Sequence, residues 1–195
     1  MTDFPEALAH RYLAHFGDAR RILDVGCGTG SFARLAPPTV EVHGVDRDRI
    51  ALAQASRGGM TVTDIDLARE PLPFGDSSFD AALAKDVLEH LPDPLAVLRE
   101  LRRVLAPGAP LVASVVVDIP RRVWADYTHV RGFTREAAMR LLNDGGFTVS
   151  SVERMGPVPG SVRFGFVDRI PALLRIPGIG RMWTASWELF CTRAP

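Results

Sequence analysis

The strongest constraint on this chain is a glycine-rich segment with the sequence RILDVGCGTGS at residues 21–31. Its apolar run ILDV has the pattern of a buried β-strand, and three glycines follow at alternate positions. Glycine lacks a Cβ atom, so the backbone can turn sharply there and approach a ligand closely. A helix-like segment at 31–36 comes next, and the start of a helix offers free N–H groups. Strand, glycine turn and helix in this order predict a nucleotide-binding corner.

The spacing of the glycines separates two classes of cofactor. A dinucleotide-binding loop has the pattern G-x-G-x-x-G, which begins at Gly26 and Gly28 but meets Ser31 where the third glycine belongs. The chain has D-x-G-x-G-x-G instead, from Asp24 to Gly30. A carboxylate at this place would repel a pyrophosphate, whereas it suits the ammonium group of S-adenosyl-L-methionine (SAM). The pattern therefore favours SAM over a dinucleotide.

This segment resembles the first motif of the class I SAM-dependent methyltransferases, in particular the type 11-like group that acts on small molecules, lipids and glycans. The resemblance covers most of residues 20–110. It implies SAM as the cofactor and an α/β fold with a Rossmann-like, doubly wound, seven-stranded, mostly parallel sheet whose last strand is antiparallel. We therefore expect the following loop residues to bind the cofactor: Asp24, Gly26, Cys27, Gly28 and Gly30.

A second acidic position supports nucleotide binding. Asp46 ends the predicted strand at 41–46 and lies 20 residues after Gly26. A carboxylate at this place can accept hydrogen bonds from both hydroxyls of a ribose, which SAM and NAD share. We expect Asp46, and Arg47 beside it, to contact the cofactor.

A third strand, predicted at 60–63, leads to the acidic pair of Asp64 and Asp66. The resemblance assigns Asp64 to the adenine amino group and the backbone of Ile65 to the edge of the ring. Asp66 is a competing choice for the adenine contact, because the two carboxylates differ only by register.

The run KDVLEHLPDP begins at Lys85, directly after an apolar strand pattern at 79–84. It resembles a motif of methyltransferases that act on small molecules and lipids. Ligands bind at the carboxyl ends of the strands in open α/β sheets. We expect Lys85 to line the methionine part of SAM. His90 is a candidate general base, and the alternative is that it has a structural role.

The segment 118–133 follows the predicted fifth strand and is crowded with aromatic and basic residues. Such groups together can hold an acidic or aromatic substrate. Part of it, YTHVRGFT, resembles a segment of methyltransferases that act on glycans, lipids and natural products. His129 is the first candidate for a general base, because it is titratable and lies in a loop that faces the site. Its structural alternative is to tie this loop to the helix predicted at 134–143.

Residues 155–186 form a second unusual segment, rich in proline, glycine and large apolar residues, with an arginine at every sixth position from 163 to 181. Arginines beside apolar stretches can rest on a membrane surface. A substrate lid, a protein interface and a packed surface insertion are alternatives. We expect a peripheral membrane contact or a substrate-side insertion here.

Composition limits the partners of the chain. With 23 basic and 23 acidic residues the formal net charge is zero, which argues against a nucleic-acid partner held by a broad basic field. Two cysteines make no disulfide framework, and neither a signal peptide nor a spanning apolar run is apparent. We expect one domain over residues 1–195, a cytoplasmic location and no metal site.

These observations predict an enzyme that moves a methyl group from SAM to a small-molecule, lipid or glycan-type acceptor. Two alternatives stay open. A SAM-binding module without catalysis would keep the same loop, and an NAD-dependent oxidoreductase would keep Asp46. The short N-terminal helix leaves little material to close a pocket, so we expect an acceptor that is extended or partly outside it. The oligomeric state is not predicted.

Overall fold

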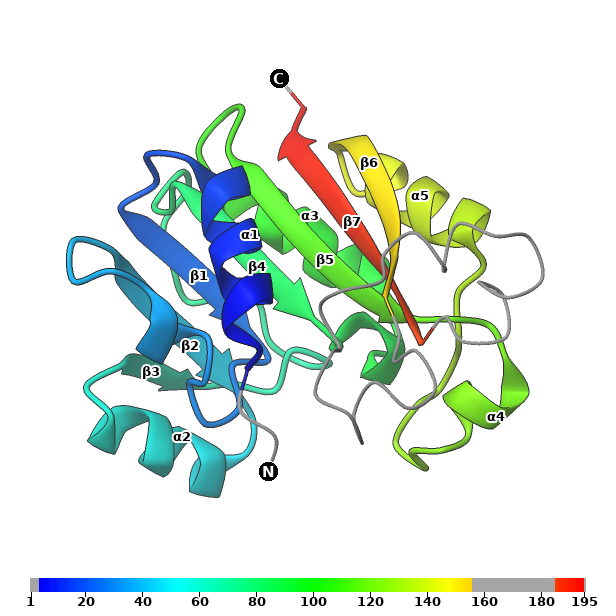
Figure 1. Cartoon of the computed structure of the whole chain (residues 1–195), viewed down its shortest axis with the longest axis horizontal. Helices are drawn as coiled ribbons and strands as arrows, with labels where there is room; N and C mark the ends of the chain where they lie inside the picture. Colours follow the sequence, from blue (N-terminus) through cyan, green and yellow to red (C-terminus); the bar gives the residue numbers. More distant parts are fainter. Residues whose placement is uncertain (1–3, 156–184, 195) are drawn as a thin grey trace.

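The computed structural model describes residues 4–155 and 185–194, and seven strands in this part of the chain form one sheet (Figure 1). The strands are β1 (Arg21–Val25), β2 (Glu41–Asp46), β3 (Thr61–Asp64), β4 (Ala81–Lys85), β5 (Pro110–Val116), β6 (Phe147–Met155) and β7 (Ser186–Arg193). Their order across the sheet is β3-β2-β1-β4-β5-β7-β6. β7 is antiparallel to β5 and β6, and the remaining pairs are parallel. The predicted α/β fold is confirmed, including the antiparallel last strand.

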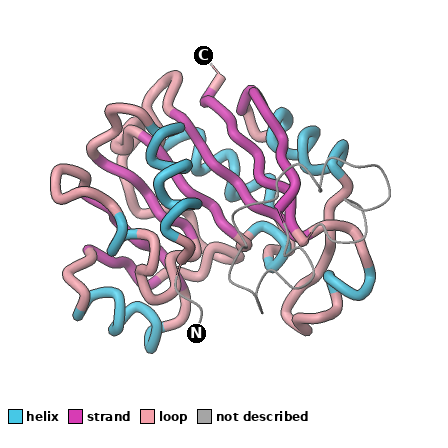
Figure 2. The backbone as a smooth tube through the Cα atoms, in the orientation of Figure 1, coloured by secondary structure: helices cyan, strands magenta, loops and turns pink. Residues whose placement is uncertain are grey.

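Helices cover both faces of this sheet. The α-helices are α1 (Glu6–Phe16), α2 (Arg49–Arg57), α3 (Pro94–Val104), α4 (Pro120–Val123) and α5 (Arg135–Asp144). Leu8 of α1 and Leu52 of α2 belong to one buried cluster, whereas Leu98 of α3 and Leu142 of α5 belong to another. Figures 1 and 2 show α1 in front of the sheet and α3 behind it. Strands buried between two helical layers explain why β1, β4 and β5 read as nearly continuous apolar runs.

Side-chain caps decide where three of the helices begin. Asp48 accepts hydrogen bonds from the first-turn N–H groups of Ile50 and Ala51, so α2 begins at Arg49. Asp93 caps α3 in the same way, and Pro94 suits the first turn because it has no N–H to satisfy. Thr134 caps α5, as predicted.

One expectation about helices is wrong. The segment after the glycine loop is no α-helix but a single 3₁₀ turn, η1 (Ala33–Leu35). The loop therefore does not place its ligand at the positive end of a helix. The short N-terminal helix begins at Glu6 after Pro5, and no side chain caps it.

The sheet has its topological switch point between β1 and β4. The chain proceeds from β1 outward to β2 and β3, then returns to β4 and proceeds the other way to β5. Connections therefore leave the carboxyl ends of β1 and β4 in opposite directions, which opens a crevice at this edge. The glycine loop after β1, Asp46 at the end of β2 and Lys85 at the end of β4 meet there.

The segment 118–133 also begins at this edge. It contains α4 and loops, and a parallel bridge between Val117 and Phe133 closes its base. Most of the other unusual segment, residues 156–184, lies outside the described residues. Among the helices that the structure describes, none is long and apolar enough to cross a membrane.

Candidate cofactor and acceptor site

The glycine loop is held in place by its own backbone. The N–H groups of Gly26 and Cys27 both donate to the carbonyl of Val45, at 2.8 and 3.1 Å. Gly26 has a φ of +72°, and a Cβ atom there would lie 3.1 Å from the side chain of Val87. Both the left-handed backbone and the close approach therefore require glycine at this position.

Asp46 connects the loop with the end of β2. Its Oδ2 accepts a hydrogen bond from the N–H of Gly28 at 2.9 Å, and its Oδ1 accepts one from the N–H of Asp48 at 2.9 Å. Each carboxylate oxygen can accept a further bond, so these contacts orient the group and leave it able to bind ligand hydroxyls.

Gly26 lines two separate cavities. The first has a volume of about 240 Å³ and is lined by Gly26, Asp46, Arg47, Ile65, Asp66, Leu67, Ala68, Asp86, Val87, His90, Leu91 and Thr128. The second has a volume of about 390 Å³ and is lined by Phe4, Pro5, Asp24, Gly26, Cys27, Gly28, Thr29, Ser31, Phe32, Ala51, Leu83 and Lys85. An elongated ligand with different chemistry at its two ends fits this division.

The second cavity is lined by a buried carboxyl group, that of Asp24, and by a half-buried amine, that of Lys85. Burial raises the pKa of Asp24 to about 7, and the carboxylate of Asp46 adds to this, while Lys85 acts in the opposite direction. Burial alone would lower the pKa of Lys85, but the carboxylates of Asp86, Glu188 and Glu89 outweigh it and raise this pKa. Lys85 also forms an ion pair with Asp86. A ligand that carries both an ammonium and a carboxylate group finds a partner for each here.

Cys27 lines the same cavity as a thiol. Burial, followed by the charges of Asp24 and Asp46, raises its pKa. A buried thiol that holds its proton is a poor nucleophile, so Cys27 is not suited to nucleophilic catalysis.

The two acidic residues after β3 have different surroundings. Asp64 is paired with Arg49, whose Nε lies 2.6 Å from its Oδ2, and it lines neither cavity. Asp66 and Ile65 do line the first cavity. The turn therefore brings Asp66, the competing choice, to this cavity, whereas Asp64, the residue that the resemblance indicates, does not line it.

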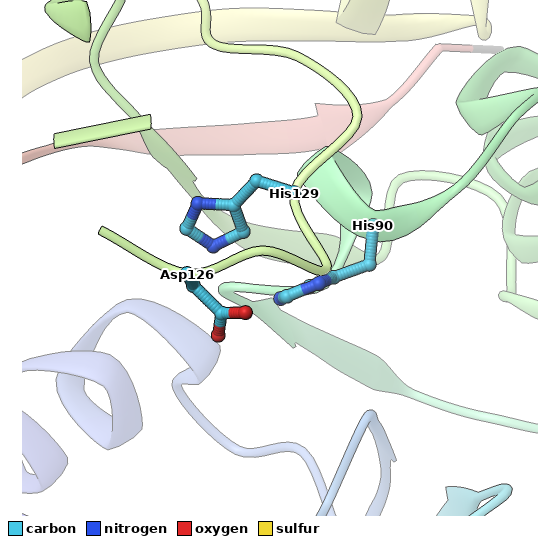
Figure 3. Close-up of side chains that lie close together, drawn as sticks. All are labelled: His90, Asp126 and His129. Atoms are coloured by element: carbon cyan, nitrogen blue, oxygen red, sulfur yellow. The ribbon is translucent and has the colours of Figure 1, made fainter. Parts of the chain in front are cut away.

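The two predicted bases lie together although they are far apart in the sequence. His90 belongs to the 3₁₀ turn η2 (Leu88–His90), which follows β4, whereas His129 belongs to the loop after α4. Their ring centroids are 4.6 Å apart, and Figure 3 shows Asp126 beside them. Burial and the neighbouring His129 lower the pKa of His90, so its ring is neutral near pH 7.

Hydrogen bonds assign the tautomer of each ring. His129 donates from Nδ1 to the carbonyl oxygen of Val123 at 2.7 Å. The hydroxyl of Thr128 donates to Asp126 Oδ1 at 2.6 Å, so this hydroxyl accepts from Nδ1 of His90, 2.9 Å away. In the neutral form of each ring the lone pair is then on Nε2. Thr128 gave no signal in the sequence, because its role depends on two residues that only the fold brings near it.

Glu89 fixes the position of the histidine-bearing loop. It is buried, its Oε1 accepts from the N–H of Val116 at 3.2 Å, and its carbonyl accepts from the N–H of Val130 at 2.9 Å. Burial raises the pKa of this carboxyl to about 7. These bonds join the ends of β4 and β5 to the loop, so His90 and His129 are held near each other.

Comparisons with known proteins agree with this geometry. Residues 23–113 match the sequence model of a family described as "Methyltransferase domain". The chain is 39% identical over 167 residues to the methyltransferase GfsG of Streptomyces halstedii, covering 82% of this chain and 52% of that protein. It is 34% identical over 106 residues to a ubiquinone biosynthesis O-methyltransferase of Cereibacter sphaeroides, covering 52% of this chain and 43% of that protein. The chain thus spans about half the length of these curated relatives or less.

Solved structures share the whole architecture. A SAM-dependent methyltransferase from Archaeoglobus fulgidus superposes with a TM-score of 0.74 over 96% of this chain and 92% of that one, at 21% identity. At this identity the structural likeness establishes the fold alone. Assignment to a family rests on the sequence relatives and the family model. The glycine loop, the carboxylate at the end of β2 and the matched residues 23–113 together show that this chain belongs to the class I SAM-dependent methyltransferase family, whose cofactor is SAM.

Proposed function

We propose that this chain transfers a methyl group from SAM to a hydroxyl group of a small-molecule acceptor. The observation that carries the proposal is the cavity of about 240 Å³, which Asp46 and His90 both line beside Gly26. It combines a nucleotide-binding carboxylate with a group able to accept a proton. The relatives from Cereibacter sphaeroides and Aspergillus nomiae are both named as O-methyltransferases, which supports oxygen as the acceptor atom.

The cofactor roles follow from the two cavities. We assign the ribose hydroxyls to Asp46 and the adenine to Ile65 and Asp66, with Arg47 at the rim of the same cavity. Asp24 and Lys85 line the other cavity and suit the ammonium and carboxylate groups of the methionine end. Bound SAM supplies a methyl group on a positively charged sulfur, which is already activated for transfer.

The protein then has to position the acceptor and remove its proton. We propose His129 as the first candidate for this base and His90 as the second. Each ring has its Nδ1 engaged and the lone pair of Nε2 directed elsewhere, as a general base requires. Positioning of the reacting atoms accounts for the rest of the rate enhancement.

The acceptor side is formed by the segment 118–133. Trp124 and Tyr127 are 64% and 95% exposed there, so aromatic surface is available next to the histidines. We propose that this surface binds an acceptor that extends out of the pocket, such as a lipid, a glycan or a carrier-linked metabolite. A peripheral membrane contact through 155–186 belongs to the same proposal. Two free, buried cysteines, Cys27 and Cys191, fit a reducing compartment, which supports a cytoplasmic location.

Calorimetric titration with S-adenosylhomocysteine tests the cofactor site. Asp46→Asn keeps an acceptor for the loop N–H but loses the charged contact with the ribose. We expect about a 100-fold loss of affinity, because two charge-assisted hydrogen bonds of about 1.5–3 kcal/mol each are weakened. Asp18→Asn, the same change at an exposed position outside the site, is the matched control.

Methyl transfer is then measured with radiolabelled SAM against phenols, sugars and lipid-linked alcohols. Turnover of any of them confirms the enzyme and names its acceptor class. A folded protein that binds S-adenosylhomocysteine but methylates none of a broad panel would favour a SAM-binding module without catalysis. Binding of NAD in place of S-adenosylhomocysteine would favour the oxidoreductase.

A further inference from the structure

We propose that His90, Asp126 and His129 form a binding site for a divalent transition-metal cation of the Zn²⁺ class (Figure 3). Each residue offers one ligand atom, and these three atoms lie within 4.8 Å of one another. Figure 3 shows the three side chains converging on one space from two separate segments. Within residues 4–155 and 185–194, no other group of three such side chains comes this close together.

The ligand set indicates which cations fit. Two imidazole nitrogens and one carboxylate oxygen suit borderline cations such as Zn²⁺, whereas Mg²⁺ and Ca²⁺ prefer oxygen ligands alone. Three protein ligands are typical of catalytic rather than structural zinc sites, because they leave a position for water or substrate.

The surrounding hydrogen bonds prepare each side chain for a cation. A metal-bound histidine normally donates its other ring N–H to a carbonyl or a carboxylate, which orients the ring. His129 does so with the carbonyl of Val123. His90 donates instead to the hydroxyl of Thr128, and this hydroxyl in turn donates to the carboxylate of Asp126. Thr128 donates its N–H and its hydroxyl to the same oxygen, Oδ1 of Asp126, so a cation would be bound through Oδ2.

The three side chains can close around an ion without rearranging the fold. Ligand atoms around a tetrahedral zinc ion lie about 3.4 Å apart, given metal–ligand distances of about 2.0–2.1 Å. The ligand atoms therefore have to move closer together to bind an ion. Asp126 can make this movement by side-chain rotation, because it is exposed, whereas both histidines are half-buried. The backbone bond from Val130 to Glu89 already ties the two segments together.

The position of the site suggests its use. His90 and Thr128 line the cavity that also contains Asp46, so the cation site borders the cofactor site. A cation there would bind an acceptor oxygen and lower the pKa of its hydroxyl, the proton leaving to solvent. This consequence rests on the proposed methyl transfer, but binding of the cation does not. With the cation bound, the imidazoles act as ligands in place of bases.

The test is calorimetric titration of the whole chain with Zn²⁺, after removal of metal with a chelator. We expect one site per chain, with an affinity that falls more than about tenfold in His129→Ala and in Asp126→Asn. Thr128→Val removes only the supporting hydroxyl, and we expect a loss of about 10–100-fold from that change. His10→Ala is the matched control, because His10 is an exposed histidine on α1, away from the site.

Two results would overturn the cation site: no binding of Zn²⁺ by the folded wild type, or equal affinities in the wild type and the exposed Asp126→Asn variant. Thermal melting of every variant distinguishes a lost site from a lost fold. Titration of the same samples with S-adenosylhomocysteine separates the two proposals. Cofactor binding without Zn²⁺ binding rejects the cation site alone, whereas the reverse rejects the cofactor site alone.

Discussion

Asp24→Asn is expected to make the protein more stable and at the same time to weaken cofactor binding. Asp24 is 4% exposed at the end of β1, and burial raises its pKa to about 7 from an ordinary value of 3.8. Asparagine has nearly the same shape but no charge to bury. The charged carboxylate therefore destabilises the folded chain. Its favourable contribution is to the binding of a cationic ligand.

The magnitude follows from proton linkage. Between pH 3.8 and about 7 the unfolded chain has lost the proton of this carboxyl, whereas the folded chain retains it. Stability due to the protonated group is complete below pH 3.8 and declines as the pH rises to about 7. Each pH unit in this window costs about 1.4 kcal/mol, so the wild type loses about 3 kcal/mol between pH 5 and pH 8 through this group.

Urea unfolding at pH 5 and pH 8 measures the effect. The difference in unfolding free energy between Asp24→Asn and the wild type should grow by about 3 kcal/mol over this interval. The same difference for the exposed Asp18→Asn should stay nearly constant. Affinity for S-adenosylhomocysteine should fall in Asp24→Asn at pH 8. If the stability difference is the same at both pH values, the proposed burial of a charge at this position is wrong.

Two further predictions concern packing and capping. Gly44→Ala should destabilise the protein by about 1–3 kcal/mol, because the new Cβ would lie 2.5 Å from the sulfur of Cys27 under the glycine loop; thermal melting checks this, with Gly75→Ala as a control, since a Cβ there meets no atom within 4 Å. Thr134→Ala should cost about 1 kcal/mol by removing the N-cap of α5; urea unfolding checks this against the exposed Thr39→Ala, and equal losses in the two variants would show that the cap contributes nothing.

Much of the fold was predictable because its signals are local. The apolar runs of β1, β4 and β5 identify strands buried on both faces, whatever the distant parts of the chain do. The caps at Asp93 and Thr134 are set by neighbouring residues in the sequence. The prediction of a helix at 31–36 was wrong, because a helical pattern this short has little stability of its own.

The proximity of three candidate site residues was predictable, because each has a fixed place in the sheet. Asp24 and Lys85 end adjacent strands, and Asp46 ends the strand on the other side of β1, so the sheet brings all three to one edge. Asp64 and Asp66 could not be separated in this way. They differ by the register of a turn, and that register is set by backbone pairing with β2, where Asp64 pairs with Asp46 and the N–H of Ile65 donates to the carbonyl of Asp46.

What the sequence determined by itself is the corner after β1, because the spacing of glycines and a carboxylate limits both the backbone and the ligand. What only the tertiary structure decided is the meeting of His90, Asp126 and His129. They lie in connections that follow β4 and β5, and their distance depends on hydrogen bonds through Glu89 and Thr128. Contacts between residues far apart in a chain leave no periodic pattern in it, because packing of the whole sheet, rather than local geometry, brings them together.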